Sequence, residues 1–136
     1  MKPHNAQRLS DYIELSTEEM ISRSAAVYHS LKRRHSIRQF SRRKVPKTVI
    51  ENCIKAAGTA PSGANHQPWH FVAIQSAEIK RQVREAAEAH EQRFYAGRAG
   101  DEWLDALKPL GTDAQKPYLE HAPWLIAIFS QKKGGV

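Results

Sequence analysis

The chain has 136 residues, of which 40 % are apolar and 26 % are charged, and its net charge is +7. This length suits one domain better than two, and this composition excludes a disordered or fibrous protein. The sequence shows no leading apolar region of the secretory type and no stretch long enough to cross a bilayer, so we expect a cytoplasmic protein without membrane contact.

Two helices are expected in the first part of the chain. The segment 11–32 can be capped by Ser16 or Thr17, and apolar residues recur in it at helical spacing. A second helix should begin near Pro46, because the following apolar residues form one stripe, and Gly58 should end it.

Two strands are expected further on, with a helix between them. The segment 69–75 is short, aromatic and β-branched, and helical periodicity resumes from 78 to about 98. The segment 124–130 is continuously apolar, which predicts a strand that is buried on both faces. Two strands make an incomplete sheet, since sheets in stable domains usually have more.

The positive charge is concentrated between the first two predicted helices. Charge alone suits a phosphate or a nucleic-acid backbone equally well. Within this segment, Arg34 and Arg38 flank Ser36, and two guanidiniums with a hydroxyl suit a phosphate monoester. The alternative is a solvated basic loop. The segment has eight basic residues and no acidic one: Lys32, Arg33, Arg34, Arg38, Arg42, Arg43, Lys44 and Lys47.

A loop at 60–69 precedes the first predicted strand. Two prolines and a glycine exclude regular helix there, so the hydroxyl of Ser62 and the amides of Gly63 and Ala64 can point at a ligand. The alternative is a structural connection whose polar side chains bond their own backbone.

Three residues further along could bind an amino-acid zwitterion. Glu91 and Tyr95 are four positions apart on the expected helix, where the carboxylate and the phenol could meet an ammonium group. Lys116 could meet a carboxylate. The alternative is an exposed helix face without such a role.

Other chemistries lack their sequence signatures. His66 and His70 lie on either side of Pro68, which rules out helical spacing of metal ligands, so no metal site is expected. The single cysteine, Cys53, is expected to be buried on its helix rather than reactive. The sequence contains no dinucleotide-binding glycine motif.

Taken together, the Arg34–Arg38 motif, the 60–69 loop and the zwitterion set resemble the FMN-dependent nitroreductase superfamily, from residue 33 to about 131. Within it they are most similar to the iodotyrosine deiodinase branch. The resemblance implies an α+β fold, a mixed sheet flanked by helices, whose C-terminal part this chain would lack. It implies one incomplete domain over 1–136, with a helical extension over 1–32.

The same resemblance implies the site residues. It places the flavin phosphate and ribityl chain at Arg34, His35 and Ser36. It implies that Glu91, Tyr95 and Lys116 hold the substrate zwitterion and close a helical lid, while the amide of Ala64 bonds the phenolate. No catalytic residue is assigned within this chain. The flavin ring would contact Arg38, Pro61, Ser62, Gly63 and, as a further contact, Asn65.

The resemblance implies an FMN-dependent oxidoreductase that reductively dehalogenates iodotyrosine and other halotyrosines. It implies a homodimer with FMN at the interface, and electrons from a reduced nicotinamide such as NADPH or from another reductase. The alternatives are a broad nitroreductase or quinone reductase, an inactive fragment of one, and a non-enzymatic nucleic-acid-binding protein. A nitroaromatic substrate would not need the zwitterion set.

Overall fold

The structure, a computed structural model, describes residues 10–132. The chain divides after Ser36 into two compact units, Met1–Ser36 and Ile37–Val136. The description of residues 1–136 as one domain with a helical extension over 1–32 stays a prediction. Within the described residues, no helix is both long enough and apolar enough to cross a membrane.

The first unit contains the helix α1, Thr17–Lys32. Ser16 caps it: its hydroxyl accepts from the Glu19 amide at 3.2 Å, and the Glu19 carboxylate accepts from the Ser16 amide at 3.4 Å. A cap of this kind stabilises a helix by about 1 kcal/mol. The predicted start at residue 11 is wrong, because Ser16 is extended and the residues before it lie outside the helix.

The second unit alternates helices with two strands. Its first helix confirms the predicted start after Pro46 and the predicted end at Gly58. In chain order the elements are α2 (Lys47–Gly58), η1 (Gly63–Asn65), β1 (Trp69–Ile74), α3 (Ala77–Arg93), the π-helix η2 (Phe94–Arg98), α4 (Asp101–Leu107), η3 (Lys108–Leu110), α5 (Tyr118–His121) and β2 (Leu125–Ser130).

The two strands form an antiparallel pair. Trp69 lies opposite Ser130, and Ile74 lies opposite Leu125. Both strands were predicted within one residue of their observed ends. The predicted α+β class is confirmed, with two antiparallel strands making up the sheet in the part of the chain that the structure describes.

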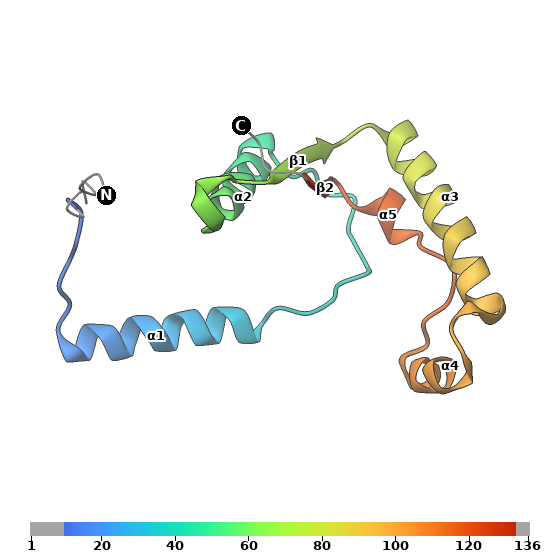
Figure 1. Cartoon of the computed structure of the whole chain (residues 1–136), viewed down its shortest axis with the longest axis horizontal. Coiled ribbons are helices and arrows are strands. Elements are labelled where there is room, and N and C mark those ends of the chain that lie inside the picture. The colour runs from blue at the N-terminus through green and yellow to red at the C-terminus, as the bar shows by residue number, and fades with distance from the viewer. Residues whose placement is uncertain (1–9, 133–136) are drawn as a thin grey trace, which may run out of the picture. The chain divides into compact units, whose positions relative to one another are not determined.

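Three contacts connect parts of the second unit around this sheet. Figure 1 shows α2 beside β1, and α5 next to α3. The Trp124 indole N–H donates to the Val45 carbonyl at 2.9 Å, which ties the segment before α2 to the start of β2. This bond joins two segments that are 79 positions apart in the sequence.

The apolar residues are poorly covered. Among residues 10–132, only Ala122 and Lys80 are buried. The prediction that the second strand is buried on both faces is wrong, because Ile128 on β2 is 66 % exposed. The prediction that Cys53 is buried is also wrong, since the thiol lies on the exposed side of α2.

We therefore expect the purified 136-residue chain to self-associate. Exposed apolar side chains on β2, such as Ile128 and Phe129, and the unpaired edges of a two-stranded sheet favour contacts with other copies. Sedimentation velocity at several concentrations measures this, and Ile128→Ser should reduce the associated fraction. Lys108→Ser, on an exposed helix end, is the control. A concentration-independent monomer with a cooperative thermal transition would contradict the expectation.

Candidate functional site

The loop between α2 and β1 has an unusual backbone. Ala64, Asn65 and Gln67 have φ values of 50°, 55° and 45°. These lie in the left-handed region, which costs a residue with a side chain about 1 kcal/mol or more. The strain is held in place by Ser62, whose hydroxyl accepts from the Gln67 amide at 2.9 Å and whose carbonyl accepts from the Asn65 amide at 3.0 Å.

This loop presents donors that suit a flavin. Among the hydrogen bonds that the structure describes, none uses the amides of Gly63 and Ala64. A Cβ built at Gly63 would meet no atom within 4 Å, so there is open space beside this residue. The Ser62 oxygen accepts a loop bond, and its proton remains available to donate. The loop can therefore serve both as a structural connection and as a binding site.

The three residues predicted to hold a zwitterion are connected through the segment 112–116. Glu91, on the last turns of α3, lies 3.2 Å from the Lys116 ammonium. Tyr95 lies in η2, and its hydroxyl is 3.1 Å from the Thr112 hydroxyl. The Lys116 ammonium also donates to the Asp113 carbonyl at 2.6 Å. The structure thus brings an acid and a base that are 25 positions apart into direct contact.

The ion pair is partly withdrawn from solvent. The Lys116 side chain is 15 % exposed and the Glu91 side chain 33 % exposed. Attraction between charges increases as water is excluded, so this pair is stronger than an ordinary surface pair. A ligand that separates the two groups must offer a charge to each of them.

Arg38 and Lys116 line the same pocket. Its volume is about 320 Å³, and Thr112 and Tyr118 also form its wall. The Arg38 guanidinium lies 5.9 Å from the centre of the Tyr118 ring, a cation–π distance. One residue predicted from the sequence to contact a flavin and one predicted to contact its substrate therefore share a pocket within the second unit.

Arg34, His35 and Ser36 belong to the first unit. Their predicted contact with the flavin phosphate and ribityl chain stays a prediction. The same holds for Pro61, which precedes the strained loop.

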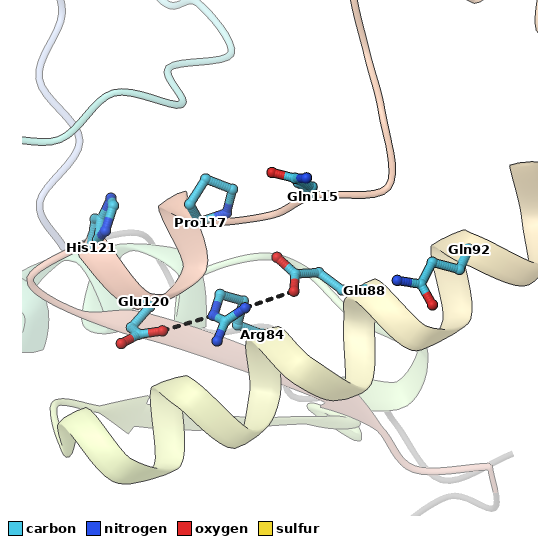
Figure 2. Close-up of a pocket in the computed structure, with 7 residues that line it drawn as sticks. All are labelled: Arg84, Glu88, Gln92, Gln115, Pro117, Glu120 and His121. Atoms are coloured by element: carbon cyan, nitrogen blue, oxygen red, sulfur yellow. Dashed lines mark hydrogen bonds and ion pairs between the residues drawn. The ribbon is translucent and has the colours of Figure 1, made fainter.

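Sequence reasoning missed the polar residues of α3 that hold the segment after residue 115. Figure 2 shows the Arg84 side chain between two carboxylates, with its Nε 2.7 Å from Glu120 and its Nη1 2.7 Å from Glu88. The hydrogen bond to Glu120 is the largest cause that raises the pKa of Arg84 above its ordinary value, so this cation keeps its charge. Lys80, Arg84 and Glu88 recur at intervals of four, and this spacing was the available signal.

Comparison with known proteins identifies relatives over most of the chain. The nitroreductase family model matches residues 31–135. An iodotyrosine deiodinase from Haliscomenobacter hydrossis is 48 % identical over 116 residues, which cover 85 % of this chain and 52 % of that protein. Iodotyrosine deiodinase 1 from Mus musculus is 47 % identical over 117 residues, covering 86 % of this chain and 41 % of that protein.

Solved structures agree. An iodotyrosine deiodinase bound to FMN and 3-iodo-L-tyrosine matches with a TM-score of 0.74 and 33 % identity, over 80 % of this chain and 59 % of that chain. A BluB-like flavoprotein from Clostridium difficile 630 matches with a TM-score of 0.59 and 27 % identity, over 77 % and 48 %. The predicted nitroreductase-like fold is confirmed. The chain spans about half the length of the curated relatives it matches.

Proposed function

The chain belongs to the nitroreductase family, and on that premise we propose that it takes part in FMN-dependent reductive dehalogenation of halotyrosines. The observation that carries the proposal is the ion pair between Glu91 and Lys116. Lys116 lines a pocket together with Arg38. The relative whose structure contains FMN and 3-iodo-L-tyrosine supports the same choice of cofactor and substrate.

For the cofactor, we propose that the flavin ring lies against Arg38 and against Pro61, Ser62 and Gly63, next to the strained loop. The amides of Gly63 and Ala64, which make none of the described hydrogen bonds, and the Ser62 hydroxyl proton support the proposal, since isoalloxazine offers carbonyl and ring-nitrogen acceptors. Bound reduced FMN would supply two electrons; with one proton from solvent they would replace the carbon–halogen bond by a carbon–hydrogen bond, with halide leaving.

Phosphate binding is assigned to Arg34, His35 and Ser36, whose donors suit a phosphate monoester. We further propose a homodimer with FMN at its interface, and a reduced nicotinamide or another reductase as the electron source. The exposed apolar side chains of the chain are consistent with association.

For the substrate, the protein exchanges its own ion pair for two new ones. The ligand ammonium meets Glu91, and the ligand carboxylate meets Lys116, so each charge keeps a partner when the Glu91–Lys116 pair opens. Tyr95 donates to the ligand carboxylate in place of Thr112. The Ala64 amide donates to the phenolate; this amide makes none of the described hydrogen bonds, and its residue lies in the left-handed region.

Replacing Arg38 by Ala should weaken FMN binding by about tenfold to a hundredfold, the loss of one charge-assisted hydrogen bond. Arg42→Ala is the matched control, because Arg42 belongs to the same basic segment and is not assigned to the flavin. FMN fluorescence on titration with protein measures the affinity. Equal losses in both variants would show that the basic segment attracts FMN only through its total charge.

A further inference from the structure

Lys116 is fixed at both of its ends by one helix. Its ammonium lies 3.2 Å from the Glu91 carboxylate, and its backbone N–H donates to the Glu88 carboxylate at 2.7 Å. Glu88 and Glu91 are three positions apart on α3, so they share one face of the helix. Two carboxylates on adjacent turns therefore hold the same lysine, one by its side chain and the other by its main chain.

The hydrogen bond from the Lys116 N–H to Glu88 fixes the main chain from which the lysine side chain extends. The Lys116 carbonyl accepts from the Leu119 amide at 3.0 Å, so the first turn of the following α5 also uses this residue. Pro117 has no amide proton, which leaves the Lys116 N–H as the last donor before the turn. The Glu88 side chain is 18 % exposed, and a hydrogen bond to a carboxylate that is largely shielded from water is stronger than one in water.

Glu88 is itself held in place. Its second oxygen accepts from Arg84 Nη1 at 2.7 Å, and Arg84 Nε donates to Glu120 on α5 at 2.7 Å (Figure 2). One turn earlier, the buried Lys80 ammonium donates to the carbonyls of Glu120 and Ala122 at 3.0 and 2.6 Å. Cations near the last carbonyls of a helix are favourable. The segment from Lys116 to Ala122 is thus attached to α3 at successive turns.

We propose that Glu88 is a positioning residue for substrate recognition: by holding the Lys116 amide, with Arg84 supporting it, Glu88 places the Lys116 ammonium where a substrate carboxylate binds. This inference rests on the proposed function for the role of Lys116. It adds a residue that contacts neither substrate nor flavin and acts only through Lys116. Preorganising the lysine removes part of the entropy loss that a flexible side chain would otherwise suffer on binding.

The first test compares two ligands in the FMN-loaded protein by flavin fluorescence. Glu88→Ala should weaken binding of 3-iodo-L-tyrosine about tenfold and leave 2-iodophenol within about twofold, because the phenol has no carboxylate for Lys116. Glu88→Gln should recover part of the loss, since the amide oxygen can still accept from the Lys116 N–H, while the amide NH2 cannot accept from Arg84. Glu78→Ala is the control, because the Glu78 carboxylate bonds Arg81 and Gln82 on the same helix.

A double-mutant cycle separates positioning from general support of the fold. Once Lys116→Ala has removed the ammonium, adding Glu88→Ala should cause no further loss of 3-iodo-L-tyrosine affinity. Additive losses, or an equal loss of 2-iodophenol affinity in Glu88→Ala, would overturn the proposal.

Amide hydrogen exchange provides a readout that needs neither flavin nor ligand. In Glu88→Ala the Lys116 amide should exchange about tenfold faster than in the wild-type chain, whereas Glu78→Ala should leave it unchanged. An unchanged rate in Glu88→Ala overturns the positioning role whatever the ligand results are. A faster rate in Glu88→Ala, together with a wild-type protein that does not bind 3-iodo-L-tyrosine, would retain the Glu88–Lys116 contact and reject the proposed function instead.

Discussion

3-Iodo-L-tyrosine is expected to bind the FMN-loaded protein about tenfold to a hundredfold more tightly than 3-iodotyramine, the analogue without a carboxylate. The reason is the ion pair between Glu91 and Lys116, which is closed in the structure at 3.2 Å. A zwitterion replaces both halves of this pair. An ammonium alone takes Glu91 and leaves Lys116 without a counter-charge in a partly buried position, which is costly.

The affinities of the remaining analogues should follow from the same ion pair. The des-amino acid, which retains only the carboxylate, should bind as weakly as 3-iodotyramine. Neither should exceed 2-iodophenol by more than about threefold, because the charge gained at one partner is offset by the charge stranded at the other. Calorimetric titration of the four ligands tests this. Affinities that rise in equal steps with each added charge would show that the Glu91–Lys116 pair does not need to open.

Lys116→Ala and Glu91→Gln should each lower the affinity for 3-iodo-L-tyrosine by about 1.5–3 kcal/mol, one to two powers of ten. Each variant removes one charge-assisted contact with the ligand. Binding of 2-iodophenol should barely change, since it never made that contact. Flavin fluorescence quenching by the two ligands measures the difference.

Lys108→Ala is the matched control for these variants. Lys108 also forms an ion pair, with Asp105 at 2.6 Å, but its side chain is 76 % exposed. Its replacement should alter neither affinity. Equal losses for both ligands in Lys116→Ala and Glu91→Gln would mean that these residues only support the fold, and a broad nitroreductase would then be the better assignment.

Local sequence signals predicted those elements whose ends depend on single residues. Ser16, one of the two predicted caps, caps α1, and Pro46 and Gly58 bound α2. The two strands were found from continuous apolar and β-branched runs. These signals act within a few residues, so they can be read without knowing the tertiary structure.

Irregularities within elements and contacts between distant elements were not predicted. The helix after β1 was predicted over 78 to about 98, but the change to a π-helix at Phe94 and the φ of 133° at Gly97 within it were not, because neither has a sequence period. The short helix α5 is held by side chains of α3 that are about 40 positions away, such as Lys80. Burial failed for a related reason: an apolar strand predicts a covered face, but Ile128 is exposed where no described element packs over it.

The residues of the candidate site were predicted in part, whereas the contacts between them were not. Residue types and helical spacing suggested Glu91 and Tyr95, and charge complementary to a carboxylate suggested Lys116; the resemblance to a family then implied that the three hold one substrate. Only the structure shows that Glu91 and Lys116 form an ion pair, and that Arg38 lines a pocket with Lys116. The role of Glu88 could not be predicted, because its bond is to a backbone amide 28 positions away.

The central claim is that this chain combines a flavin site with a zwitterion site. The most direct test is the visible absorption spectrum of the chain after incubation with FMN and desalting, recorded before and after 3-iodo-L-tyrosine is added. We expect the protein to retain flavin absorption. The absorption should shift on addition of 3-iodo-L-tyrosine and shift much less with 2-iodophenol at the same concentration. A colourless protein, or a flavin spectrum that both ligands change equally, would contradict it.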